Sequence, residues 1–430
     1  MRRPLVAGPR ARAASIRSVA AVAAVGVLAA CAAQPSVGQY RADVAYQQVS
    51  LGEASALPQL LAANDELGLA MLRSGEAPNV VVSPFSAYVA LAMLAEGARG
   101  GTAESFDAAL GAAGADRTDA VNALRGALLV HDGDPAVAAG DELPEAPLLH
   151  LADRVLLDDE LVPEQAFLEV LARSYDAGIE TVDLGTDAAK PVLDEWVNRE
   201  TGGLVPESAI VPKPSLRIVL QDAMVLAARW LVPFDPNNTF EEPFETPDGM
   251  VDVEMMHGTA DGAWPVTEAD GWTAVRLPYV DGFVADLVLP PDGVDPADAD
   301  AATLAALWDG TEPAGSVTVT VPVLDLEARP LDLTPSLTDV GLGELFDAPD
   351  LSGITTADSL FVDQAVQQAR LMVDEDGTVA AAVTEIGVAG SAAPLPAVEV
   401  RFDRPFLVRV AHEDTGLTLF LAAIRDPGAD

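Results

Sequence analysis

The chain has 430 residues, half of them hydrophobic, so it can bury a large core and is not a disordered polypeptide. Its 24 basic and 67 acidic residues give a formal net charge of −43 at pH 7. A surface this negative repels nucleic acids and heparin-like polyanions, so we expect neither as a partner. Because Cys31 is the only cysteine, the chain can form no internal disulfide bond.

The first 30 residues have the pattern of an export signal. Five arginines precede an apolar run from Val19 to Ala30, which is too short to span a membrane as a helix. The run ends in Leu28-Ala29-Ala30-Cys31, which resembles the bacterial lipobox, whose cysteine becomes the lipidated first residue of the mature protein. The alternative is a plain signal peptide cleaved nearby. We expect lipidation, contact with a membrane only through this anchor, and a location at the cell surface or outside the cell.

Beyond the signal, we expect a polar tether at residues 31–50 and one domain at 51–427, because no long linker or repeat interrupts the latter. The spacing of apolar residues predicts helices at 57–72, 86–96, 163–176 and 189–199. It predicts strands at 218–226, 273–278, 283–289, 316–324, 369–373, 398–402 and 417–424. Because helices and strands do not alternate regularly, we expect an α+β fold rather than a doubly wound sheet.

The sequence lacks the motifs of common enzymes. It has no Gly-x-Ser-x-Gly elbow, no phosphate-binding Gly-Lys-Ser/Thr loop and no His-Glu-x-x-His motif. Its four histidines have no metal-ligand spacing: His131, His150, His257 and His412. We therefore expect neither an enzyme nor a metal or other cofactor.

A long segment separates the expected strands at 369–373 and 398–402, and such loops in compact domains are usually functional. From Gly377 to Pro396 it consists mainly of small and β-branched residues, and Glu385 is its only charge. In an extended conformation one face would be uncharged: Thr378, Ala380, Ala382, Thr384 and Ile386. The segment is therefore suited both to an exposed loop and to a strand inside a sheet. The alternative is a flexible, alanine-rich surface loop.

These residues resemble the hinge and reactive loop of the serpin family of protease inhibitors. In that family an acidic residue, Gly-Thr and a run of alanines precede the bait peptide, and the matching residues are Glu375, Gly377, Thr378, Ala380, Ala381 and Ala382. Further matches follow the family's order from residue 52 to Pro427: NVVVSPFSAYVALAMLAEGARGGT, DEWVNRETGGLVP, DAMVLAARWLVPF, VEMMHG and VEVRFDRPFLVRV. The resemblance implies the serpin fold, with helices packed on three β-sheets and an exposed reactive loop at 376–397.

The resemblance also implies a mechanism. A serine protease, or a cysteine protease, would cleave the loop, which would then insert into the large sheet and trap the acyl-enzyme. The family's spacing from the hinge places the cleaved bond at Ser391–Ala392, whereas counting back from Pro405 gives Pro394, so we assign it to the range 389–395. No Lys or Arg lies between Asp376 and Val400, which favours an elastase-like or subtilisin-like target.

We expect the inhibitor to be a monomer. The alternative function is that of a non-inhibitory serpin, which would be a binding or structural protein at the surface. The alanine run of the hinge argues against it, because such serpins commonly carry larger residues there.

One departure from the family pattern concerns the point where the large sheet opens. The family has a cluster of serine, asparagine and histidine there, and the matching residues of this chain are Ser83, Ser86, Asp222 and Gln367, with Trp230 nearby. We expect the amide of Gln367 to donate a hydrogen bond to Asp222 and so latch the sheet. The alternative is that these are ordinary buried polar residues.

Replacing Cys31 by serine should abolish acylation of the mature protein and its partition into detergent, because it removes the only candidate for lipidation. The measurement is the intact mass of the wild-type and variant proteins recovered from membranes and medium. A mature wild-type chain that begins elsewhere, or an unmodified Cys31, would instead indicate a plain signal peptide.

Overall fold

The computed structural model describes residues 37–140, 142–308, 315–327, 329–356, 360–378 and 397–429. All of them belong to one unit, Pro35–Asp430. Three sets of predicted residues lie outside the described ranges: Cys31, the hinge alanines Ala380–Ala382, and Ser391 with Ala392.

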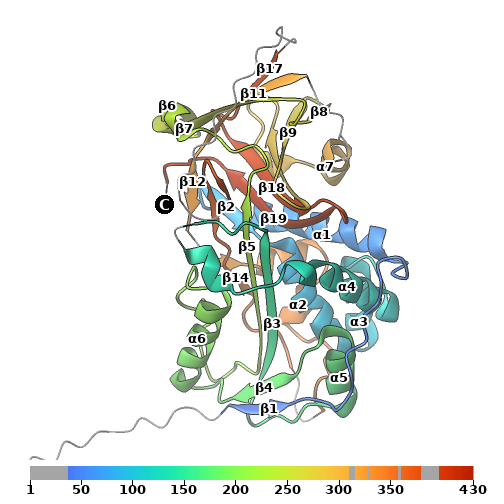
Figure 1. The fold of residues 1–430 in the computed structure, drawn as a ribbon. Helices are drawn as coiled ribbons and strands as arrows, with labels where there is room; N and C mark the ends of the chain where they lie inside the picture. The colour runs from blue at the N-terminus through green and yellow to red at the C-terminus, as the bar shows by residue number, and fades with distance from the viewer. Residues whose placement is uncertain are drawn as a thin grey trace, which may run out of the picture. The chain divides into compact units, whose positions relative to one another are not determined.

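The large sheet contains seven strands among the described residues, in the order β1-β4-β3-β5-β16-β15-β12 (Figure 1). Their bounds are β1 Gly38–Tyr40, β3 Leu148–Asp158, β4 Ile179–Val182, β5 Ile218–Arg229, β12 Leu324–Leu326, β15 Leu371–Val373 and β16 Gly377–Thr378. The two long strands β3 and β5 pair antiparallel along almost their whole length. They form the half of this sheet with the longest continuous pairing.

Two further sheets complete the main framework. One has the order β2-β19-β18-β10-β9-β8, with β2 Asn79–Val82, β8 Val266–Ala269, β9 Trp272–Pro278, β10 Phe283–Leu289, β18 Phe406–His412 and β19 Leu417–Ile424. The other has the order β17-β11-β7-β6, with β6 Thr239–Thr246, β7 Gly249–Asp261, β11 Ser316–Pro322 and β17 Ala397–Arg401. A two-stranded ribbon joins β13 Leu331–Asp332 to β14 Val366–Gln367.

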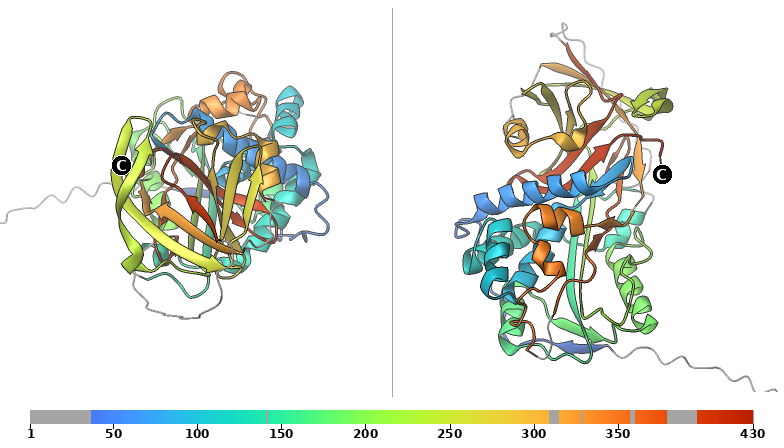
Figure 2. Two further views of the ribbon diagram at one scale, coloured as in Figure 1. Left: turned by 90° about the horizontal axis from the view of Figure 1, so that it is seen from above. Right: turned by 180° about the vertical axis from the view of Figure 1, so that it is seen from behind.

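The helices of the described ranges are α1 Leu57–Ser74, α2 Pro84–Glu96, α3 Gly100–Ala109, α4 Gly114–Leu128, α5 Gln165–Val170, α6 Lys190–Glu200, α7 Ala301–Trp308 and α8 Thr334–Asp339. A π-helical turn, Leu171–Tyr175, continues α5. Seen from behind, α1 passes between the red strands β18 and β19 and the orange helix α8 (Figure 2). None of these helices is long and apolar enough to cross a membrane.

Alternate side chains of β5 face different helices, because successive residues of a strand point to opposite faces. Leu226 and Ala228 share a buried cluster with Tyr88 of α2, on the inner face of the sheet. Ala223 packs with Trp196 of α6, on the outer face. Any strand added beside β5 is therefore covered by α2 on its inner face and approached by α6 on its outer face.

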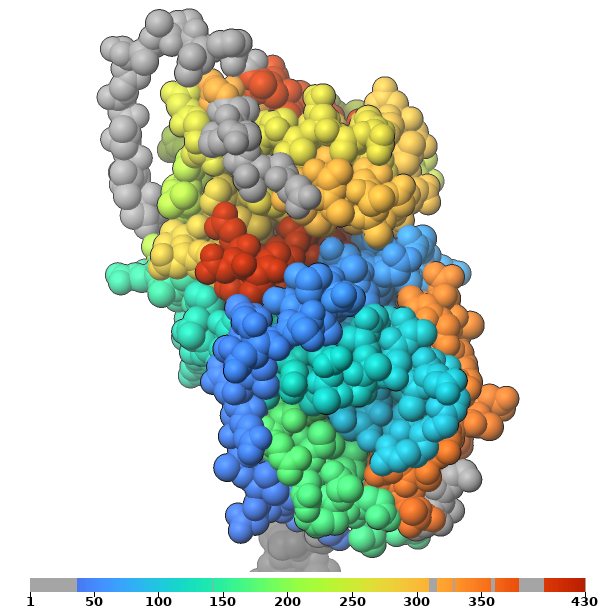
Figure 3. Space-filling model, turned by 90° about the vertical axis from the view of Figure 1, so that its right-hand side faces the viewer, coloured from blue at the N-terminus to red at the C-terminus, as the bar shows by residue number. Residues whose placement is uncertain are grey.

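The sequence predicted the α+β class correctly, and every predicted helix and strand has a counterpart in the structure. Residues 38–50, expected to be part of a tether, instead pack against β4 and α4 of the folded domain. β1 pairs with β4, and the amide of Val49 donates to Asn122 Oδ1 over 2.7 Å. In Figure 3 this blue segment lies against the teal helices. Asn122 binds it by also donating to the carbonyl of Gln47, over 3.1 Å.

Candidate functional site

The hinge begins with a tight turn between β15 and β16. The carboxylate of Asp374 accepts hydrogen bonds from the backbone amides of Asp376 and Gly377, both over 3.0 Å. Burial, reinforced by the neighbouring acidic side chains, raises the pKa of Asp374 even though these amides act to lower it. The turn is therefore held by its first residue.

Residues at the end of β5 fix this turn in place. The indole Nε1 of Trp230 donates to the carbonyl of Asp374, and its backbone amide donates to the carbonyl of Asp376, each over 2.9 Å. The backbone amide of Phe234 donates to the carbonyl of Glu375 over 2.9 Å, and Thr239 Oγ1 donates to the Glu375 carboxylate over 2.5 Å. Trp230, which the sequence placed in the sheet-opening region, thus lies at the hinge.

Gly377 and Thr378 already occupy a strand position in the large sheet. As β16 they pair antiparallel with β5, with Gly377 opposite Arg229 and Thr378 opposite Ala228. On the other side, Thr378 lies opposite Val373 of β15. A Cβ atom on residue 377 would come within 2.1 Å of the Ala228 carbonyl oxygen, so only glycine fits here.

The side chain of Thr378 points into the core and is 3 % exposed. Its hydroxyl hydrogen-bonds with the hydroxyl of Tyr279, whose ring stacks on Trp230 at a centroid distance of 4.2 Å. Burial raises the pKa of Tyr279, which keeps its hydroxyl protonated. Thr378, the first hinge residue that faces the core, is therefore buried with its hydroxyl group hydrogen-bonded.

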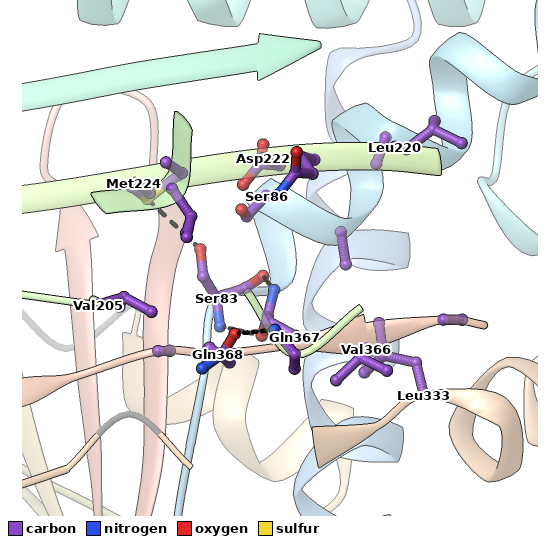
Figure 4. Close-up of a pocket in the computed structure, with 18 of the residues that line it drawn as sticks. Ser83, Ser86, Val205, Leu220, Asp222, Met224, Leu333, Val366, Gln367 and Gln368 are labelled. Carbon is purple, nitrogen blue, oxygen red and sulfur yellow. Dashed lines mark hydrogen bonds between the residues drawn. The ribbon is translucent and has the colours of Figure 1, made fainter. Parts of the chain in front are cut away.

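Beyond β16 the large sheet is parted. Among the described residues, β5 pairs with β3 and β16 but not with the segment 362–370. A cavity of about 170 Å³ separates them, and its lining includes Ala87 of α2 together with Leu220 and Met224 of β5. The lining also includes the four predicted residues Ser83, Ser86, Asp222 and Gln367 (Figure 4). We refer to this space as the cleft.

The connection after α6 closes over the cleft. The amide of Ala209 donates to Gln368 Oε1 over 2.8 Å, and the backbone of Val211 exchanges two hydrogen bonds with the side-chain amide of Gln364. Lys213 forms an ion pair with Asp363 over 2.9 Å. These contacts tie the segment 362–370 to the connection after α6 and give Gln364, Gln368 and Asp363 polar partners.

The expected hydrogen bond from Gln367 to Asp222 is absent from the described residues. Gln367 Oε1 instead accepts from the backbone amide of Ser83, and its Nε2 donates to the Ser83 carbonyl, both over 2.8 Å. The hydroxyl of Ser83 donates to the carbonyl of Leu419 over 2.9 Å. The prediction was wrong because the cleft separates β5, which carries Asp222, from β14, which carries Gln367. The latch therefore joins segment 362–370 to the start of α2.

Asp222 faces a second carboxyl group, Asp153, directly opposite it on β3. Burial, and then the charge of Asp153 with which it shares a hydrogen bond, raises the pKa of Asp222 well above its ordinary range. Burial also acts to raise the pKa of Asp153, but the ion pair with Arg125 outweighs it and lowers the value. Folded Asp222 therefore keeps its proton to a higher pH than an ordinary aspartate does, while Asp153 is the carboxylate that pairs with Arg125.

Asp222 retains one unused acceptor. Its Oδ1 atom is buried and has no hydrogen-bond partner among the described residues. Sequence reasoning missed Asp153 and Arg125, although a charged residue inside the apolar run LLHLADRVLLD was a usable signal. It also missed Tyr279, Gln364 and Gln368, whose roles depend on contacts between distant segments.

Comparison with known proteins agrees with this architecture. The family model for serpins (serine protease inhibitors) matches residues 62–427. An uncharacterized serpin-like protein of Thermococcus kodakarensis is 29 % identical over 374 residues, covering 82 % of each chain. The leukocyte elastase inhibitor of Bos taurus is 29 % identical over 395 residues, covering 86 % of this chain and 100 % of its own.

Among solved structures, the thermophilic serpin tengpin in its native state superimposes with a TM-score of 0.72. It has 19 % sequence identity, and the match covers 90 % of this chain and 97 % of tengpin. The chain therefore belongs to the serpin family, and its fold is the serpin fold, as the sequence predicted.

The Asp222→Asn variant should become progressively more stable than the wild type as the pH rises above 3.8, the ordinary aspartate value. A raised pKa means that the folded protein holds a proton which the unfolded chain releases, so stability falls by up to about 1.4 kcal/mol per pH unit in that window. The variant amide donates to Asp153 without needing that proton.

The measurement is the urea midpoint of both proteins from pH 4 to pH 8. Asp153→Asn is the matched control, and it should destabilise the fold because it leaves Arg125 without its carboxylate. Parallel pH curves for Asp222→Asn and wild type would contradict the shared proton.

Proposed function

We propose that this serpin inhibits serine proteases by offering its loop for cleavage and then inserting the loop into the cleft of the large sheet. One observation carries the proposal: Gly377 and Thr378 already lie between β5 and β15, directly above that cleft. The remaining loop residues would continue the same strand. The acyl-enzyme formed at the cleaved bond would travel with them.

In the proposed insertion the loop would continue the register of β16. Each step along the loop would move one residue back along β5, so Ala380 would lie opposite Leu226, Ala382 opposite Met224 and Thr384 opposite Asp222. On the other side the same register would set Thr384 opposite Gln367. These loop side chains would face α2, where small residues are suited to the narrow cleft.

The inserted Thr384 would supply what Asp222 lacks. Its hydroxyl would lie opposite the buried Oδ1 atom that has no partner in the described residues. A donor there would remove the cost of an unsatisfied buried acceptor, which is about 1–3 kcal/mol. Asp222 and Gln367 would then meet through the loop residue rather than directly.

Insertion would be favourable overall because it completes the sheet. About ten residues would gain ladder hydrogen bonds, each contributing roughly 0.5–1.5 kcal/mol net. Moving catalytic groups of the bound protease by even about 1 Å can slow their reaction about a hundredfold. Deacylation would therefore stall while the protease is attached.

For the target, we propose a protease of elastase-like or subtilisin-like specificity, with Ser391–Ala392 as the cleaved bond. Loop composition supports this choice, because residues 377–398 contain no basic side chain. A relative named leukocyte elastase inhibitor agrees with it. We further propose that export and lipidation at Cys31 place the inhibitor on the cell surface.

Wild-type protein incubated with a subtilisin-like protease should form a complex that survives denaturing electrophoresis. Ala380→Arg should abolish that complex and leave only the cleaved inhibitor, because its side chain would have to enter the apolar core beside Leu226. Ala380→Ser is the control, since it keeps the residue small. An undiminished complex with Ala380→Arg would contradict insertion. Cleavage of the wild type without any complex would favour a non-inhibitory serpin.

A further inference from the structure

The cleft between β5 and the segment 362–370 has the size and the walls of a small-molecule site. Its volume is about 170 Å³, and an apolar cavity of roughly 150 Å³ is enough to hold benzene. Ala90 and Leu91 line the cleft from α2, Leu220 and Met224 line it from β5, and Val366 lines it from β14. A ligand of the size of a substituted benzene ring therefore fits among apolar side chains.

Both faces of the sheet contribute to these walls. Phe420 of β19, a strand that packs on α2, lines the inner side, whereas Val205 and Ile210, in the connection after α6, line the outer side. That connection is tied to the segment 362–370 through Gln364 and Gln368. A bound ligand would thus exchange water for apolar contacts on both sides, which favours its binding.

One buried acceptor interrupts the apolar walls. The Oδ1 atom of Asp222 is buried and has no hydrogen-bond partner among the described residues. Ser86 of α2 lies beside Asp222 in Figure 4. Across the cleft Gln367 is already engaged, since it exchanges two hydrogen bonds with the backbone of Ser83. A ligand that brings one donor to the Oδ1 atom would therefore satisfy this acceptor.

The charges beside this acceptor favour a neutral ligand. Asp222 lies opposite Asp153, which pairs with Arg125. Burial raises the pKa of Asp222 well above its ordinary range, so its carboxyl group can keep a proton and still accept through Oδ1. A ligand carboxylate would lie beside two carboxyl groups and lose its hydration, so it would bind poorly there.

A cation also lines the cleft, but further along the segment 362–370. Arg370 is three residues beyond Gln367, a separation of about 10 Å in extended chain, and its guanidinium pairs with Asp325 over 2.8 Å. Its Nε atom has no partner among the described residues, so a ligand carboxylate would be attracted to that atom. Neutral and anionic ligands therefore distinguish the two positions.

We propose that the cleft binds a small neutral phenol, whose ring packs between α2 and β5 and whose hydroxyl group donates to the Oδ1 atom of Asp222. All of these groups belong to the described residues of the uncut protein, so the site does not depend on insertion of the loop. If the loop inserts as proposed, the ligand and the loop would occupy the same space and exclude each other.

Titration of the purified, uncut protein with 4-methylphenol at pH 7, followed by NMR of the probe, tests the site. Toluene, which lacks only the hydroxyl group, should bind about tenfold more weakly, because it leaves the buried acceptor unsatisfied. The anion 4-methylbenzoate should bind more weakly still. Equal affinities for 4-methylphenol and toluene would overturn the role of Asp222, and no binding of either would overturn the site. Tightest binding of 4-methylbenzoate would overturn the proposal in favour of Arg370.

Variants of the walls assign the binding to the cleft. Asp222→Ala removes the acceptor, so 4-methylphenol should fall to the affinity of toluene, while toluene should bind as it does to wild type. Asp222→Asn is the matched control, because its side-chain oxygen can still accept, and it should keep the preference for 4-methylphenol. Ala90→Leu should abolish binding of both probes by filling their space, and it serves alone if Asp222→Ala does not fold. Unchanged affinities in Ala90→Leu, or an unchanged preference in Asp222→Ala, would refute this placement.

The titration needs no protease, so its result stands even if the protein does not inhibit. In the reaction with a subtilisin-like protease, saturating 4-methylphenol should lower the trapped fraction severalfold, while cleavage of a small peptide by the same protease stays unchanged. Unchanged trapping at saturation would overturn the placement of the ligand in the cleft. No trapping even without the ligand would refute the proposed inhibition and leave the ligand site intact.

Discussion

Among the described residues, the large sheet of this serpin has no strand pairing between β5 and the segment 362–370. Within that part of the chain its two halves are joined at β16, where two hinge residues bridge β5 and β15. Below them the facing backbone edges are separated by the cleft. A strand edge without a partner is costly and available for pairing, which is the basis of the proposed insertion.

Three glutamine side chains of the segment 362–370 find hydrogen-bond partners while the gap is open. Gln367 binds the backbone of Ser83, while Gln364 and Gln368 bind the connection after α6. These hydrogen bonds must be exchanged for ladder bonds if a strand enters, and α6 must yield at the same time. Arg154 and Gln221 connect α6 to the outer face of the sheet, since Arg154 donates to the carbonyl of Val192 and Gln221 to that of Leu193.

Much of the framework could be predicted from sequence. Apolar runs gave β10 and β19 with their observed bounds, since strands buried on both faces must be continuously hydrophobic. The strand expected at 369–373 begins only at Leu371, because the residues before it line the gap and have no neighbouring strand. Gln367 and Asp222, which the family resemblance assigned to the sheet-opening point, both line the cleft. The hydrogen bond expected between them is absent among the described residues, because the sequence does not reveal how far apart two strands lie. The proton shared by Asp153 and Asp222 likewise depends on a register that only the fold establishes.

Hydrogen exchange before and after cleavage of the loop tests the central claim most directly. If the loop fills the gap, amides of 218–227 and 362–370 should exchange at least about tenfold more slowly in the cleaved protein, as new ladder bonds form on both edges. The helix α7, which contacts α1, β8 and β9 and does not line the cleft, serves as the internal reference. Unchanged exchange in both segments after complete cleavage would contradict insertion into the large sheet.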